Sequence, residues 1–122
     1  MENQIKIRTK QIGLDVIKLV DELPRKMSAC MIAKQILRSS TSVGSNYRAA
    51  CRAKSDADFL NKLRIVEEES DETSYWLEIL EEVGLIDHLR IEKLKKETNE
   101  ITAIIVASQK TVQKKIRLKD KN

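Results

Sequence analysis

The chain has 122 residues, of which 34% are charged and 3% aromatic, with three glycines, one proline and a net charge of +4. This length suits one domain, and so few aromatic and turn-forming residues exclude a β-sandwich and favour helices. There is no uncharged apolar run of about 18 residues and no signal-peptide core at the N-terminus, so we expect a cytoplasmic protein without membrane contact.

The charges are segregated along the chain. Residues 1–54 hold 11 Lys or Arg against 4 Asp or Glu, residues 55–87 hold 2 against 11, and residues 88–122 hold 10 against 4. Such segregation suits pairing within the chain, contact between subunits, or binding of a polyanion to the basic faces. Composition alone does not choose among these three purposes.

A first helix is predicted over about residues 3–23. Its apolar residues recur at intervals of seven, four, three and four, as on one helical face: Ile5, Ile12, Val16, Leu19 and Leu23. Pro24 ends this helix, because proline lacks a backbone donor and disfavours helical geometry at the preceding residue.

A second helix is predicted over about residues 28–53, with Ser28 as its N-cap. Its apolar positions are Ile32, Ile36, Val43, Tyr47 and Cys51. Its middle is rich in residues of low helix propensity: Ser39, Ser40, Thr41, Ser42, Gly44 and Ser45. Either the helix breaks at Gly44, or it continues and its small residues let another helix approach closely. The apolar spacing keeps its phase across the segment and favours the continuous helix.

Two more helices are predicted over about residues 55–83 and 87–118. Ser55 starts the first, Gly84 is its natural C-terminal cap, and Asp87 opens the second. Their inward positions alternate at steps of four and three: Phe59, Leu63, Val66, Ser70, Thr73, Leu77 and Leu80, then Ile91, Leu94, Thr98, Ile101, Ile105, Ser108, Val112 and Ile116.

Four amphipathic helices with short connections predict an all-α fold, an antiparallel up-down-up-down four-helix bundle that forms a single domain over residues 1–122. A second apolar set exceeds what one helical seam needs: Ile7, Leu14, Ile17, Trp76, Ile79 and Ile104. We expect part of this set to be exposed on a monomer and to drive oligomerisation.

An ion pair is predicted between the second and third helices. If a short turn joins them, the numbers of facing residues sum to about 110. This places Arg38 near Glu72. It also places Ser42 near Glu68 or Glu69. We predict that Arg38 pairs with a carboxylate of the third helix and is at least partly buried, which would fix the register. The alternative is a solvated surface pair of little energetic weight.

No catalytic constellation is recognisable. His88 is the only histidine and Glu92 lies one turn further on, but the Glu-x-x-His repeats of di-iron bundles are absent. Neither Cys30 nor Cys51 has a base to activate it beyond this histidine, and the isolated glycines form no phosphate-binding loop. We therefore expect no enzymatic activity, no bound metal and no cofactor.

Basic residues gather at the ends of the second and fourth helices. The candidate phosphate contacts are Arg48, Arg52, Lys54, Lys110, Lys114, Lys115 and Arg117, with Lys119 and Lys121 beyond them. We expect the two helices to end at opposite poles, which would give separate basic zones. Basic residues at helix C-termini also favour the helix dipole, so this interpretation stays open beside phosphate contact. With so few aromatic residues, nucleic-acid binding would be directed at the backbone and sensitive to salt.

Residues 38–80 read RSSTSVGSNYRAACRAKSDADFLNKLRIVEEESDETSYWLEIL. This stretch resembles the signature of the four-helix-bundle family of proteins encoded in 23S rRNA intervening sequences. Matching positions include Arg38, Thr41, Ser42, Gly44, Asn46, Tyr47, Arg48, Arg52, Phe59, Leu63, Glu67, Glu68, Glu69, Glu72, Tyr75, Trp76 and Leu77. Ser40 stands where the family form has glycine, and Ser45 and Ser70 stand where it has alanine. The outer helices fit by pattern alone.

The resemblance implies a four-helix bundle, ring-like homo-oligomers that are pentamers, and no catalysis. A related branch, the accessory variability determinant of diversity-generating retroelements, works with a reverse transcriptase and binds nucleic acid through a basic surface. The leading hypothesis is therefore an oligomer associated with rRNA or another nucleic acid. The second is a structural bundle that binds a protein partner, such as a reverse transcriptase, and uses the same charges for subunit contacts.

Overall fold

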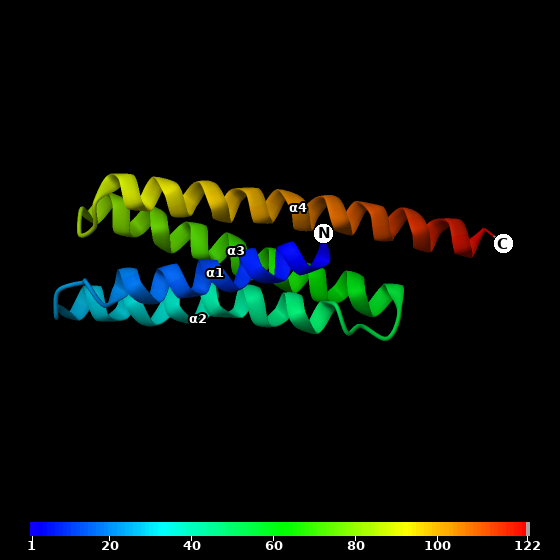
Figure 1. The fold of residues 1–122 in the computed structure, drawn as a ribbon, viewed down its shortest axis with the longest axis horizontal. Coiled ribbons are helices and arrows are strands. Elements are labelled where there is room, and N and C mark those ends of the chain that lie inside the picture. Colours follow the sequence, from blue (N-terminus) through cyan, green and yellow to red (C-terminus); the bar gives the residue numbers. More distant parts are fainter. Residues whose placement is uncertain (122) are drawn as a thin grey trace.

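The computed structural model describes residues 1–121 and confirms the all-α, up-down four-helix bundle. The helices are α1, Glu2–Val20; α2, Met27–Ala50; α3, Asp56–Val83; and α4, His88–Asp120. Consecutive helices pack against each other in antiparallel pairs, α1 with α2, α2 with α3 and α3 with α4 (Figure 1). Within these residues, no helix combines the length and the apolar character that a membrane crossing requires.

Three helix boundaries lie where the sequence predicts them. The Ser55 hydroxyl accepts a hydrogen bond from the backbone amide of Asp58. The Asp87 carboxylate accepts one from the amide of Leu89. Gly84 ends α3 with a φ of 77°, a left-handed conformation that glycine adopts without steric penalty. These caps set the two turns that flank α3.

Other boundaries differ from the prediction. Ser28 is not an N-cap, because α2 already begins at Met27, after Lys26, and no side chain caps it. The first two helices end earlier than predicted, at Val20 and Ala50. At both places the α-helix is followed by a 3₁₀-type turn, in which backbone amides donate to the carbonyls three residues before them.

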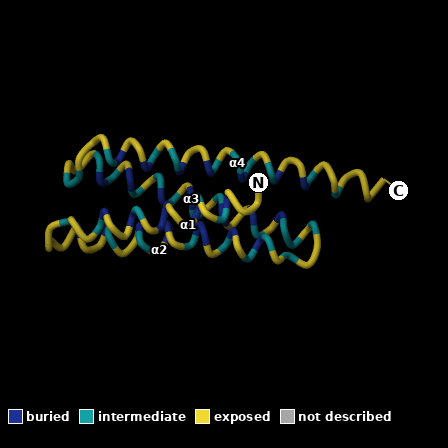
Figure 2. The backbone as a smooth tube through the Cα atoms, viewed as in Figure 1, coloured by how far each residue is buried: buried dark blue, intermediate teal, exposed yellow. Residues whose placement is uncertain are grey.

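The predicted apolar stripes face the interior of the bundle (Figure 2). One core cluster lies toward the α2–α3 turn and holds Ile5, Ile12, Val43, Tyr47, Ala50, Leu63, Val66, Ile101 and Ile105. The other lies toward the opposite end and holds Val16, Leu19, Ile32, Ile36, Leu77, Leu80, Ile91 and Leu94. Some predicted positions are only half-buried: Leu23, Cys51, Phe59, Ser108 and Ile116. Next to two of them, Leu60 and Gln109 are buried instead, and the amide of Gln109 donates to Glu67 at 2.8 Å.

Hydroxyl side chains fill the middle of the bundle between the two clusters. The Thr73 hydroxyl donates to Ser39 Oγ at 3.0 Å across α2 and α3. The hydroxyls of Ser70 and Thr102 lie 2.6 Å apart across α3 and α4. Ser39, Ser70 and Thr73 are fully buried. Because buried hydroxyls are costly unless hydrogen-bonded, these contacts favour one register among the helices.

The small-residue face of α2 lies against α1, and α2 continues through Gly44 without a break. A Cβ atom at Gly44 would lie 3.2 Å from the backbone nitrogen of Lys10 and 3.3 Å from its Cα. On α1, a Cβ atom at Gly13 would lie 3.4 Å from the Cα of Thr41. The two helices therefore approach to backbone contact, which a larger residue at position 44 would prevent.

We expect Gly44→Ala to destabilise the protein although alanine is the better helix former. Alanine gains about 1 kcal/mol of helix propensity, but its methyl group meets α1 backbone, which cannot rotate aside as a side chain can. Urea denaturation should show a net loss of about 1 kcal/mol in the free energy of unfolding.

Gly13→Ala is the matched control for this substitution. Its methyl group makes an ordinary van der Waals contact, so stability should stay unchanged or rise by up to about 1 kcal/mol. Equal stability of the two alanine variants would contradict the close approach at Gly44.

Ion pairs close the seam between α1 and α4, where packing is sparser than between consecutive helices. Arg8 bonds both carboxylate oxygens of Glu97, at 2.9 and 2.6 Å, and also bonds Glu100 at 2.8 Å. At the other end of the seam, Arg90 bonds Glu22 at 2.5 Å. The hydrogen bonds from Arg8 lower the pKa of Glu97, because they favour its charged form.

The lowered pKa of Glu97 makes the contribution of Arg8 depend on pH. A carboxylate whose pKa is lower in the folded state stabilises the fold above its unfolded pKa of about 4.3, and this stabilisation is lost as pH falls through the folded pKa. Both side chains are about one-third exposed, so we expect Arg8→Gln to cost only about 0.5–1 kcal/mol at pH 7 and much less near pH 2.5. Urea denaturation at the two pH values measures this difference. A cost of the same size at both would show that Arg8 acts through packing instead of charge.

Candidate functional site

The two predicted basic zones lie together at one end of the bundle. The expectation of opposite poles is wrong, because α2 and α4 of an up-down bundle run in the same direction. Figure 1 shows both helices ending on the side of the α2–α3 turn, with α4 extending beyond that turn. The ammonium group of Lys119, near the end of α4, donates to Asp56, the first residue of α3, at 2.8 Å.

We call this end the basic pole. It comprises Arg48, Arg52, Lys54, Lys110, Lys114, Lys115, Arg117, Lys119 and Lys121, all of which are exposed. Lys115 and Lys119 both pair with Asp56, and the hydrogen bond from Lys119 lowers the pKa of that carboxyl group. Within residues 1–121, the other seven cations form no ion pair, and their side chains are exposed to solvent.

Four cations of the basic pole form a row along α4. They follow one another at steps of four, three and four, and are Lys110, Lys114, Arg117 and Lys121. At about 1.5 Å of rise per residue, the row is about 16 Å long. An extended row of charge suits an extended polyanion better than a compact anion.

Within residues 1–121, the basic pole offers no exposed aromatic side chain on which a base could stack. Tyr47 is buried in the core, and that burial raises the pKa of its phenol. Phe59 is half-buried against the same cluster. Stacking on a base needs an accessible aromatic face, so contacts at this pole rely on charge.

Arg38 lies on the α2–α3 seam, away from the basic pole. It pairs with Glu69, Nη1 to Oε2 at 3.1 Å, and with Glu72, and these bonds raise the pKa of its guanidinium. The predicted burial is wrong: the side chain is 50% exposed, as in the solvated alternative. Glu68 is exposed and forms no ion pair in the described part of the chain.

Exposed apolar side chains form a second surface, on α1. Ile7 is 68% exposed, Leu14 41% and Ile17 39%. The other members of the second apolar set are half-buried against the core clusters: Trp76, Ile79 and Ile104. The expectation that part of this set is exposed on a monomer is therefore confirmed, for α1.

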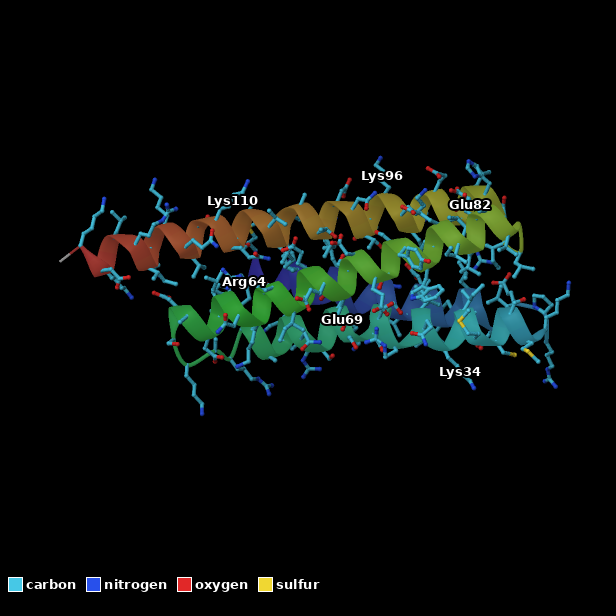
Figure 3. All side chains as sticks on the ribbon, turned by 180° about the vertical axis from the view of Figure 1, so that it is seen from behind. Lys34, Arg64, Glu69, Glu82, Lys96 and Lys110 are labelled. Atoms are coloured by element: carbon cyan, nitrogen blue, oxygen red, sulfur yellow. The ribbon has the colours of Figure 1, made fainter. Side chains whose placement is uncertain are left out.

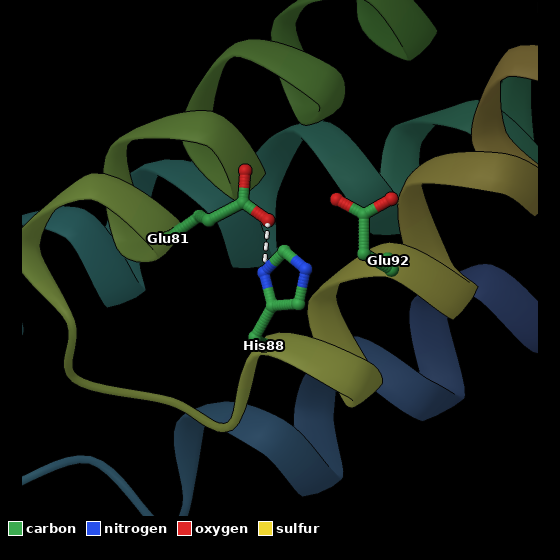
Figure 4. Close-up of side chains that lie close together, drawn as sticks. All are labelled: Glu81, His88 and Glu92. Carbon is green, nitrogen blue, oxygen red and sulfur yellow. Dashed lines mark ion pairs between the residues drawn. The ribbon is translucent and has the colours of Figure 1, made fainter.

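A third cluster lies at the α3–α4 turn, at the end of the bundle opposite the basic pole. His88 Nδ1 lies 2.9 Å from Glu81 Oε2, and Glu92 lies one turn along α4 from His88 (Figure 4). The sequence pattern places Glu92 one helical turn from His88 but does not reveal Glu81. Glu81 lies beside His88 because the chain reverses its direction at Gly84. A capping glycine between an acidic helix end and a histidine is the signal that points to this contact.

The fold and its surfaces define a charged four-helix bundle with one basic end. The chain belongs to the 23S rRNA-intervening sequence protein family, whose model matches residues 1–107. It is also similar to the crystal structure of a protein with unknown function of the S23 ribosomal protein family from Bacteroides thetaiotaomicron. That similarity has a TM-score of 0.82 and 35% identity, and it covers 89% of this chain and 97% of that one. None of the curated proteins compared with the chain matches it.

Proposed function

We propose that the protein is a non-enzymatic bundle that assembles with copies of itself and binds RNA, or another nucleic acid, through phosphate contacts at the basic pole. The main support is a group of seven exposed cations at one end of the molecule that form no ion pair within residues 1–121. Like charges held together repel one another, and a polyanion relieves that repulsion. The name of the family also directs attention to RNA, because it refers to a 23S rRNA-intervening sequence.

The helix dipole does not account for this surface. Its effect is confined to the last turn of a helix, which in α4 includes Arg117 and Lys119. Lys110 and Lys114 lie further from the helix end, and Lys54 lies outside any helix. The family match ends at residue 107, so the cationic row of α4 supports the proposal by its own geometry.

Removing the cationic row should weaken RNA binding. We expect the fourfold variant Lys110→Gln, Lys114→Gln, Arg117→Gln and Lys121→Gln to bind a single-stranded RNA about 10- to 100-fold more weakly at 50 mM salt. The dependence of binding on salt should also flatten, because fewer counterions are released on contact. Fluorescence anisotropy with a labelled RNA at several salt concentrations measures both effects.

A second fourfold variant controls for the loss of charge alone. Lys18→Gln, Arg25→Gln, Lys26→Gln and Lys34→Gln removes the same charge from exposed residues toward the opposite end, and Figure 3 shows Lys34 and Lys110 toward opposite ends of the bundle. This variant should bind RNA nearly as well as the wild type. If both variants weaken binding equally, or if wild type gives no binding at low salt, the nucleic-acid role is wrong and the structural or partner-binding alternative is favoured.

The exposed α1 stripe supports self-association. Ile7, Leu14 and Ile17 leave apolar area in water that a second copy would cover. The family resemblance points to a ring-shaped pentamer, and a ring would repeat the basic pole around its axis. The alternative occupant of this stripe is a different protein partner, such as a reverse transcriptase.

Polar substitution of the stripe should weaken assembly. We expect the double variant Leu14→Gln and Ile17→Gln to raise the subunit dissociation constant by about 10- to 100-fold, because it removes apolar area from the interface. Light scattering across a dilution series measures the shift. Met27→Gln with Leu89→Gln, two exposed apolar residues at helix starts, is the control and should assemble as the wild type does. A wild type that is monomeric at all concentrations would contradict self-association.

A further inference from the structure

Three potential metal ligands converge at the α3–α4 turn. Glu81 comes from the last turn of α3, and His88 and Glu92 come from the first two turns of α4 (Figure 4). The reversal at Gly84 and the cap at Asp87 hold the two helix ends together. One ligand atom from each of the three side chains lies within 4.8 Å of the others.

These distances are close to those of a coordinated cation. Nitrogen and oxygen ligands about 2.0–2.2 Å from a metal ion lie about 2.8–3.6 Å from each other. His88 Nδ1 and Glu81 Oε2 are already 2.9 Å apart, and small side-chain rotations would bring Glu92 into the same range. The three side chains therefore need little rearrangement to share one ion.

Glu81 has one oxygen atom that is available as a ligand when His88 is neutral. Its Oε2 atom is buried and accepts no hydrogen bond within residues 1–121, although His88 Nδ1 is near it. Its other oxygen, Oε1, is held by the Lys95 ammonium at 3.1 Å. Lys95 thus orients the carboxylate and leaves Oε2 directed toward the histidine, with a lone pair free to bind a cation.

We propose that Glu81, His88 and Glu92 form a binding site for Zn²⁺ or a similar first-row divalent cation that ties the end of α3 to the start of α4. One imidazole and two carboxylates are a suitable ligand set for such an ion, and the imidazole disfavours Mg²⁺ and Ca²⁺. The histidine side chain is 69% exposed, so water completes the coordination. This position is separate from the basic pole and does not depend on nucleic-acid binding.

Lys95 tunes the affinity of this site. Its ammonium lies 3.1 Å from Glu81 and 3.7 Å from Glu92, so it competes with the cation for both carboxylates. A positive charge at this distance weakens the binding of a second one. We expect a moderate dissociation constant, between about 1 and 100 µM, and tighter binding in Lys95→Gln.

The single histidine makes the test specific. In the wild-type chain, kept reduced, the only imidazole signals in a proton NMR spectrum belong to His88. Titration with Zn²⁺ should shift these signals with a saturable profile. The melting temperature should rise over the same concentration range, because the ion binds the folded state. Lys95→Gln should reach saturation at a several-fold lower Zn²⁺ concentration.

Matched variants separate the site from general electrostatics. Glu81→Gln and Glu92→Gln should each weaken Zn²⁺ binding at His88 by at least about tenfold, because each removes a charged ligand. Glu82→Gln removes the same charge from the neighbouring exposed position and should leave the titration unchanged. Unmoved imidazole signals at 1 mM Zn²⁺ (about tenfold above the weakest expected constant), or a shift equal in all these variants, would overturn the proposal. Far-UV circular dichroism verifies that each variant is folded.

Discussion

The parallel direction of α2 and α4 determines the electrostatics of this molecule. With three short turns the chain reverses at each helix, so the second and fourth helices end at the same pole. At that end α2 is followed by Arg52 and Lys54, and α4 carries a cluster of basic residues from Lys110 onward. The acidic run of α3 begins only at Glu67, and two acids near the pole pair with lysines, Asp58 with Lys62 and Asp56 with two α4 lysines. Charge segregation in the sequence therefore becomes an electrostatic polarity of the fold.

Packing in the middle of the bundle holds this polarity in place. Gly44 lets α1 approach α2 to backbone contact, and the hydroxyl bonds from Ser39 to Thr73 and from Ser70 to Thr102 fix the neighbouring registers. Sliding α3 along α4 would leave the buried Ser70 hydroxyl without its partners, which is costly. Ser39 and Thr73 would lose their mutual bond but keep bonds to carbonyls of their own helices. The surface pairs of Arg38 follow the same register but are exposed, so they contribute specificity more than stability.

Local sequence patterns predict the buried helix faces and several helix ends. They do not predict contacts between helices that are not consecutive in the sequence. Heptad spacing identifies the buried faces, and Ser55 and Gly84 mark helix ends because each cap depends on adjacent residues alone. The bond between Arg8 and Glu97, by contrast, joins helices that are not consecutive, and no local spacing encodes it. The position of the turn predicts which residues of α3 face Arg38. The solvent exposure of Arg38 cannot be predicted in this way, because it depends on how α2 and α3 pack. The directions of the helices in an up-down bundle are enough to predict that both groups of basic residues lie at one end.

Backbone-resolved NMR tests the basic pole most directly. A titration of isotopically labelled protein with a short single-stranded RNA at low salt reports which amides respond. We expect chemical-shift changes centred on residues 48–56 and 110–121, reversed by added salt. Changes centred on the opposite end of the bundle, or on the acidic face of α3, would contradict it.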